Sequence, residues 1–174
     1  MKKSVRSSIL ALLITVLFSG PLSAAGEQEY VIKKTFDSVV PVFMNGHAGD
    51  PNWIEGFLYS GEILLDGAVI GTVSGEARLW NPPLDLFAPY HQISLKVTNT
   101  ITGMGSFEVH AQGLALASSS THTAGDAVVA WSGSITNGKD AFSDAYGLTA
   151  GNIITNFFAG NASGTEVVRI RFGF

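Results

Sequence analysis

The sequence predicts an all-β protein: a small antiparallel barrel of about eight strands that closes on itself and follows a cleaved signal peptide. Three features lead to this prediction: an N-terminus of secretory type, repeated alternation of apolar and polar residues, and an unusual composition. Charged residues are only 14% of the chain, glycine supplies 20 of its 174 residues, and cysteine is absent. An exported chain without cysteine forms no disulfides, so its stability must come from burial and sheet pairing.

The N-terminal segment has the three parts of a signal peptide. Lys2, Lys3 and Arg6 precede an apolar run over 9–18, and the small residues of 23–25 follow. A membrane-spanning helix needs roughly 20 apolar residues, about twice the length of this run. We therefore expect cleavage of residues 1–25, export to the periplasm or the medium, and a single barrel domain over 26–174.

The charge of the expected mature chain excludes one class of partner. Three of the 10 basic residues lie within 1–25 and none of the 14 acidic residues does, which leaves 7 basic residues and a net charge of about −7. Binding to nucleic acid requires a basic surface. We expect no nucleic-acid partner.

After Gly26 the sequence alternates with the period of β-strands, and turn residues separate the alternating runs. Loops are expected at 45–52, 84–89 and 118–125, and tight turns at 66–67, 102–105 and 137–138. The expected strands cover 30–36, 39–44, 53–60, 62–65, 68–79, 91–101, 106–116, 126–135, 141–149, 152–159 and 165–174. Short strands at hairpin spacing close as a barrel or pack as a sandwich.

A glycine-rich turn and the residues after it resemble a signature of dirigent proteins and allene oxide cyclase-like barrels. Phe142, Ala145 and Gly147 match its Phe-x-x-Ala-x-Gly spacing, and the segment 101–107 is similar to the glycine-rich hairpin of those barrels. In this pattern Phe fills the barrel end, while Ala and Gly permit close strand approach. The resemblance implies an eight-stranded antiparallel barrel, often a homo-oligomer, that binds a small hydrophobic ligand. Some members of the family guide cyclisation or coupling stereochemistry without a cofactor. The resemblance therefore suggests a cofactor-independent cyclase or isomerase.

The last expected strand supports a second interpretation. Val168, Ile170, Phe172 and Phe174 alternate up to an aromatic terminus, which resembles the C-terminal signal of bacterial outer-membrane barrels. This alternative is a noncatalytic structural or binding barrel, in water or in the outer membrane. The two interpretations differ in what they bury. A water-surrounded barrel encloses Phe107, Val109, Val129 and Trp131, whereas a membrane barrel lines its lumen with Glu108, His110 and Gln112.

The candidate catalytic residues are Glu55 and Tyr59, which alternate with Trp53 in one expected strand. A carboxyl group beside aromatic rings has a raised pKa and can act as an acid. Trp53 and Trp131 are candidate ligand-stacking residues, and Tyr90 and His91 stand at a loop–strand junction expected to form the barrel mouth.

Other candidate groups give weaker signals. His110 and Glu108 would share a strand face, either as an acid–base pair or as solvent-facing residues. The four histidines lack the spacing of metal ligands, and no nucleotide-binding fingerprint is present. We expect neither a cofactor nor a bound metal.

Overall fold

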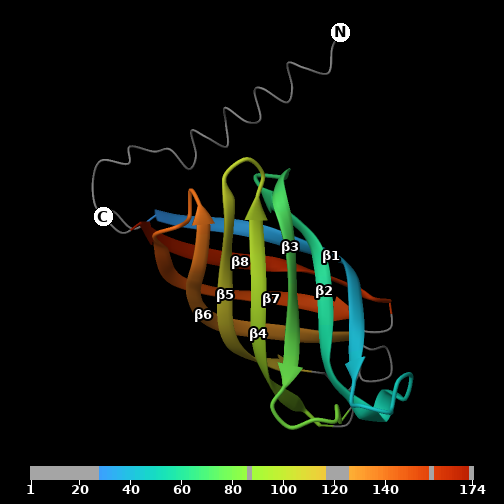
Figure 1. The fold of residues 1–174 in the computed structure, drawn as a ribbon. Helices are drawn as coiled ribbons and strands as arrows, with labels where there is room; N and C mark the ends of the chain where they lie inside the picture. The colour runs from blue at the N-terminus through green and yellow to red at the C-terminus, as the bar shows by residue number, and fades with distance from the viewer. Residues whose placement is uncertain (1–27, 86–87, 117–125, 157–158, 173–174) are drawn as a thin grey trace.

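The computed structural model describes residues 28–85, 88–116, 126–156 and 159–172, and these form a closed antiparallel barrel of eight strands (Figure 1). The strands are β1 (Gln28–Phe43), β2 (Ile54–Leu65), β3 (Ala68–Leu79), β4 (Tyr90–Ile101), β5 (Gly105–Leu116), β6 (Asp126–Asp140), β7 (Ala145–Asn156) and β8 (Asn161–Phe172). One helical turn, η1 (Pro51–Trp53), precedes β2. In the described part of the chain, no helix has the length and apolar character needed to cross a membrane.

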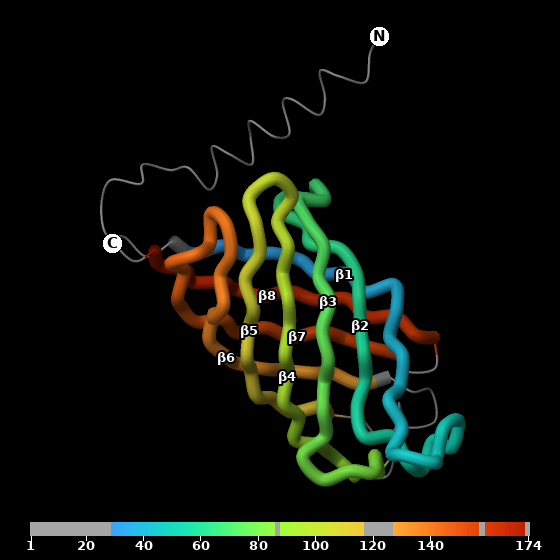
Figure 2. Tube along the Cα trace, in the orientation of Figure 1, coloured from blue at the N-terminus to red at the C-terminus, as the bar shows by residue number. Residues whose placement is uncertain are grey.

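The closed eight-stranded barrel predicted from the sequence is confirmed. Each strand pairs with the next, and the sheet closes where Gln28–Phe36 of β1 pairs antiparallel with Ala162–Ile170 of β8. β3 and β4 run steeply across β7 and β8 behind them, so the barrel has two crossing walls (Figures 1 and 2). The expected signal peptide, the loop at 118–125 and Phe174 lie outside the described residues.

The strands are fewer and longer than the sequence suggested. The segments 30–36 and 39–44 belong to the single strand β1, whose pairing with β2 shifts by one residue at Asp37. A β-bulge of this kind bends a strand without ending it, and it breaks the alternation from which strands are predicted. Likewise 53–60 and 62–65 merge into β2, and most of 141–159 forms β7.

The turn expected at Asn137-Gly138 is wrong by about four residues. β6 continues to Asp140, and the chain reverses over 141–144. Asn137 and Asp140 adopt positive φ values of 48° and 56°, which Asn and Asp tolerate better than most residues. The chain then folds back so tightly that a Cβ on Gly138 would lie 1.5 Å from the carbonyl oxygen of Phe142. Glycine is therefore required beside the turn that places Phe142.

The apolar faces of the strands point into the barrel. Phe107, Val109 and Val129 are buried, Trp131 packs against the same core, and His110 is exposed on the outside. This arrangement is the one expected for the barrel that encloses its apolar residues. The exterior carries most of the charged side chains, including the Arg169–Glu29 pair.

The two ends of the barrel differ. At one end the described connections are tight turns at 66–67, 102–104 and 141–144, and Phe142 is fully buried there against Phe107 and Phe172. This placement confirms the expectation that the aromatic residue of the Phe-x-x-Ala-x-Gly pattern fills a barrel end. At the other end the β1–β2 and β3–β4 connections are longer. From the latter, buried Leu84 donates its backbone N–H to the Ile54 carbonyl at 2.7 Å and packs on Phe57. Leu84 thus covers part of the long-loop end.

Replacing Phe142 with alanine should remove the packing that closes the tight-turn end. We expect Phe142→Ala to lower the free energy of unfolding by about 3–5 kcal/mol, because a fully buried aromatic ring leaves a cavity behind. Urea-induced unfolding measures the change. Tyr146→Ala, at an exposed position just after the same turn, is the matched control and should change stability by less than about 0.5 kcal/mol. Equal effects of the two substitutions would contradict the assigned role of Phe142.

Candidate functional site

A charged pair lies inside the barrel, at the seam where the sheet closes. Lys34 of β1 and Glu166 of β8 face inward and are only 3% and 1% exposed. The Lys34 ammonium contacts Glu166 Oε2, and the hydroxyl of Thr149 on β7 donates a hydrogen bond to Glu166 Oε1. Both oxygens of the carboxylate are therefore held in place by neighbouring strands.

The barrel interior changes the proton affinity of the groups around this pair. Burial lowers the pKa of Lys34, although the Glu166 carboxylate opposes the shift. Burial raises the pKa of Tyr59, and the negative charges of Glu166 and Glu76 raise it further. Lys34 therefore gives up a proton more readily than a surface lysine does. Tyr59 stays a neutral phenol that can donate a hydrogen bond.

Tyr59 connects the charged pair with the aromatic part of the core. Its ring meets Phe36 edge to face, with ring centroids 5.0 Å apart. A Cβ on Gly75 of β3 would lie 3.1 Å from the Tyr59 hydroxyl oxygen, so the hydroxyl rests over β3 while its charge interactions reach Glu166 on β8. Tyr59 thus lies over its neighbouring strand, within the influence of the Glu166 charge.

Small residues line much of the interior on β5–β8. Their buried or inward positions include Ala111, Gly113, Ala115, Ala127, Gly133, Ala145, Gly147, Gly151, Ala162 and Gly164. The Trp131 indole lies over one of them, since a Cβ on Gly151 would be 2.5 Å from its Cζ2 atom. β1–β4 contribute bulkier side chains such as Phe36, Ile63 and Ile93. Larger buried side chains such as Phe107, Val129 and Ile170 stand between the small ones on β5–β8, so the small residues are interspersed among bulky ones.

The residues singled out from the sequence divide into two groups. Tyr59 and Trp131 pack against the barrel core, whereas Trp53, Glu55, Tyr90 and His91 stand at the long-loop end. Trp53 belongs to η1, not to a strand as expected, and its ring stacks on His47 with centroids 3.9 Å apart.

The remaining long-loop residues have partners of their own or face solvent. Glu55 pairs with Arg78 at 2.5 Å. The His91 Nε2 atom lies 2.7 Å from the Asp85 carbonyl oxygen, and Tyr90 is exposed. Glu55 and Tyr59 are therefore in different environments, one at the rim and one inside.

The Glu108–His110 pair lies on the outer wall, as the solvent-facing interpretation expected. Their Oε2 and Nε2 atoms are 3.2 Å apart, and Asn137 donates a hydrogen bond to the same carboxylate at 2.9 Å. The hydrogen bond from Asn137 lowers the pKa of Glu108, and the hydrogen bond with His110 lowers it further.

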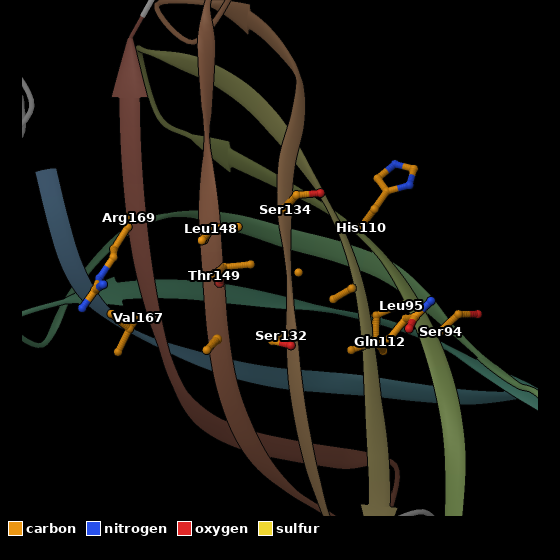
Figure 3. A pocket seen from close by; sticks show the side chains of 13 residues that line it. Ser94, Leu95, His110, Gln112, Ser132, Ser134, Leu148, Thr149, Val167 and Arg169 are labelled. Carbon is orange, nitrogen blue, oxygen red and sulfur yellow. The ribbon is translucent and has the colours of Figure 1, made fainter. Parts of the chain in front are cut away.

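A groove of about 980 Å³ lies beside this pair. His110, Ser132, Leu148 and Arg169 are among the residues that line it (Figure 3).

The sequence analysis missed the interior polar residues Lys34, Thr149, Glu166 and Asn99. A signal was present: Lys34 is in phase with Ile32 and Phe36, and Glu166 is in phase with Val168 and Ile170. A charged residue at an apolar phase of a strand predicts either a bulge or a buried functional group.

Among the described residues, no group of three or more His, Cys, Asp or Glu side chains could hold a metal ion.

Comparison with known proteins gives structural neighbours only. No family model matches the chain, and no curated protein matches it in sequence. The pterocarpan synthase dirigent protein PsPTS1 is similar in structure, with a TM-score of 0.54 and 13% identity over 86% of this chain and 97% of that one. The Diels Alderase AbmU from Streptomyces koyangensis has a TM-score of 0.50 and 15% identity over 97% of this chain and 81% of that one.

These similarities agree with the resemblance seen in the sequence. At such low identity they establish the fold alone, and the same architecture serves different activities. The chain has the barrel fold found in dirigent proteins and in cyclase-type barrels.

Proposed function

We propose that this chain is an exported barrel that binds a small hydrophobic molecule in its interior and guides its cyclisation or isomerisation without a cofactor. The observation that carries the proposal is the buried Lys34–Glu166–Thr149 cluster in an interior lined mostly by apolar side chains. The small side chains of β5–β8 support it, because they take up less of the interior than Leu or Phe would.

Stability alone does not account for the buried charges. Removing two ions from water costs several kcal/mol each, and their mutual attraction returns this only when the geometry is good. Replacing such a pair with apolar side chains of similar volume is often neutral or stabilising. A barrel that needed only to fold would be served as well by Leu or Met at positions 34 and 166. We therefore assign the pair to recognition of the ligand and to proton transfer.

The chemistry that these groups support is proton-assisted rearrangement. Tyr59 or Lys34 donates a hydrogen bond or a proton to an oxygen of the ligand, and the Glu166 carboxylate accepts a proton from an adjacent carbon. One proton enters the ligand and one leaves it, so the reaction is an isomerisation with no redox partner. Holding the ligand in one reactive conformation supplies a further part of the rate enhancement.

The long-loop end is the proposed entrance. Trp53, Glu55, Tyr90 and His91 stand there, and Leu84 covers part of the opening. In this proposal Trp131 contacts the ligand inside, Tyr59 is catalytic, and the other four residues guide entry. The names of the two structural neighbours, a pterocarpan synthase dirigent protein and a Diels Alderase, are consistent with such chemistry. The alternative remains a noncatalytic barrel that binds or has a structural role.

Contact quenching of Trp131 tests whether a ligand enters the barrel. Trp53→Phe/Trp80→Phe removes the two exposed indoles and leaves Trp131 as the reporter. The apolar probe 1-bromooctane should quench its fluorescence saturably, because bromine quenches only on close approach, and octane should reverse the effect.

The matched control is Trp131→Phe, which keeps the two outer indoles and should show little quenching at the same probe concentration. Equal quenching in both proteins would place the probe on the surface. Absence of quenching in the Trp131 reporter would refute interior binding.

A stability cycle tests whether the buried pair serves function. Lys34→Met should lower the free energy of unfolding by about 3–5 kcal/mol, because it leaves the Glu166 carboxylate buried without its partner. Lys34→Met/Glu166→Leu should recover most of this loss. Urea unfolding measures both, with Lys96→Met on the outer wall as the control. If the double variant stays as unstable as the single one, the pair is needed for folding and the functional assignment fails.

Metabolite profiling of the native host tests the reaction. A strain lacking this chain should lose the product and accumulate the unconverted substrate. The two compounds should have the same mass, because isomerisation conserves mass, and should differ in chromatographic retention time. The wild-type chain should restore the product, Glu166→Gln should not, and the exposed control Glu62→Gln should. The restored protein should be recovered from the periplasm or the medium with Gly26 as its first residue. Ligand binding without any such pair of isomers would favour the noncatalytic alternative.

A further inference from the structure

Asn99 is a buried amide that the rest of the protein does not satisfy. It faces inward from β4 between Val97 and Ile101, and it is 0% exposed. Neither its Oδ1 nor its Nδ2 atom has a hydrogen-bond partner among the described residues. The other buried positions of β4 are apolar, namely Ile93, Leu95, Val97 and Ile101.

An unsatisfied amide in an apolar interior is costly. Native proteins pair nearly all of their buried polar atoms, and each exception calls for an explanation. The aliphatic neighbours on the same strand face show that an apolar side chain suits this wall. The polar group at position 99 is therefore explained best by a partner that is not part of the protein.

The pairing register places Asn99 near the polar groups already described. Asn99 is directly opposite Val73 on β3, and Val97 is opposite Gly75, so Asn99 and Gly75 are diagonal neighbours on the inner face. Gly75 is the residue against which the Tyr59 hydroxyl rests, and Tyr59 interacts with the charge of Glu166. Asn99 thus lies one inward position from the level of Tyr59, toward the tight-turn end, with Phe107 opposite it on β5.

We propose that Asn99 recognises the polar group of the ligand, and that this group is a neutral donor–acceptor pair such as a carboxamide, a lactam or an un-ionised carboxylic acid. This inference rests on the proposed interior binding of a hydrophobic molecule. An amide side chain offers a carbonyl acceptor beside two N–H donors, so a ligand amide satisfies both of its ends at once.

Other ligand groups fit this site less well. A ketone or an ester only accepts hydrogen bonds, and it leaves Asn99 Oδ1 without a donor. A carboxylate has the same defect and adds a negative charge to an interior where Lys34 is already paired with Glu166. The site therefore selects a neutral group that both donates and accepts.

Matched pairs of probes test the selection. Hexanamide, octanamide and dodecanamide are compared with the methyl esters of the same acyl chains by isothermal titration calorimetry. The wild-type barrel should prefer the carboxamide of each binding pair by about tenfold, as expected for one additional satisfied hydrogen-bond partner in a buried site. Equal affinity for carboxamide and ester would overturn the inference while leaving the proposed interior binding intact. Binding of neither probe at any chain length would overturn both.

Two substitutions separate recognition from structure. Asn99→Leu should fold into a barrel at least as stable as the wild type, bind the esters within about twofold of wild type, and lose the preference for carboxamides. Thr155→Val is the control, because Thr155 is buried like Asn99 but its hydroxyl already donates to the Asn161 carbonyl. It should keep the preference. If Asn99→Leu still prefers carboxamides, Asn99 does not recognise the polar group. If Asn99→Leu does not yield folded protein, the comparison of carboxamides with esters in the wild-type protein decides which class of ligand binds.

Discussion

The ion pair between Lys34 and Glu166 lies on the seam that makes this sheet a barrel. β1 and β8 would otherwise be open edges with unpaired backbone groups, which favour aggregation. The seam pairs Lys34 with Gly164 and Ile32 with Glu166, so the two charges are diagonal neighbours on the inner face. A slip of one residue would turn one charge to the outside and leave the other buried alone. The native register of closure is therefore the one that keeps the two charges together inside the barrel.

Closure also explains which parts of the fold could be predicted. Alternation is reliable where one strand face is buried, and the faces of β4 and β5 follow the pattern along their whole length. Prediction failed where geometry interrupts the alternation. The bulge at Asp37 divided β1 into two expected strands, and the positive φ at Asn137 resembled a turn inside β6. The turn lies further along because Phe142 has to reach the core, and that requirement comes from long-range packing.

The candidate site was harder to predict than the fold, for a physical reason. Charged side chains usually face water, so Lys34 and Glu166 were not considered as interior groups even though their phase indicated the core. The aromatic candidates divided evenly, since Trp53 and Tyr90 stand at the long-loop end. Tyr59 and Trp131 were identified as site candidates and pack against the interior, whereas Glu55 is held by Arg78 at the rim. The pairing of a charge with its partner depends on strands more than a hundred residues apart, which no local pattern contains.

The same features that make the interior costly make it useful. Exclusion of water strengthens the interactions of Lys34, Tyr59 and Glu166 with any dipole placed among them. Two of the small residues of β5–β8 lie directly beside the pair, since Gly164 is opposite Lys34 and Gly151 is opposite Glu166. Thr149 of β7 adds a hydrogen bond to Glu166. The seam therefore closes the barrel and also sets the two charged groups among small side chains.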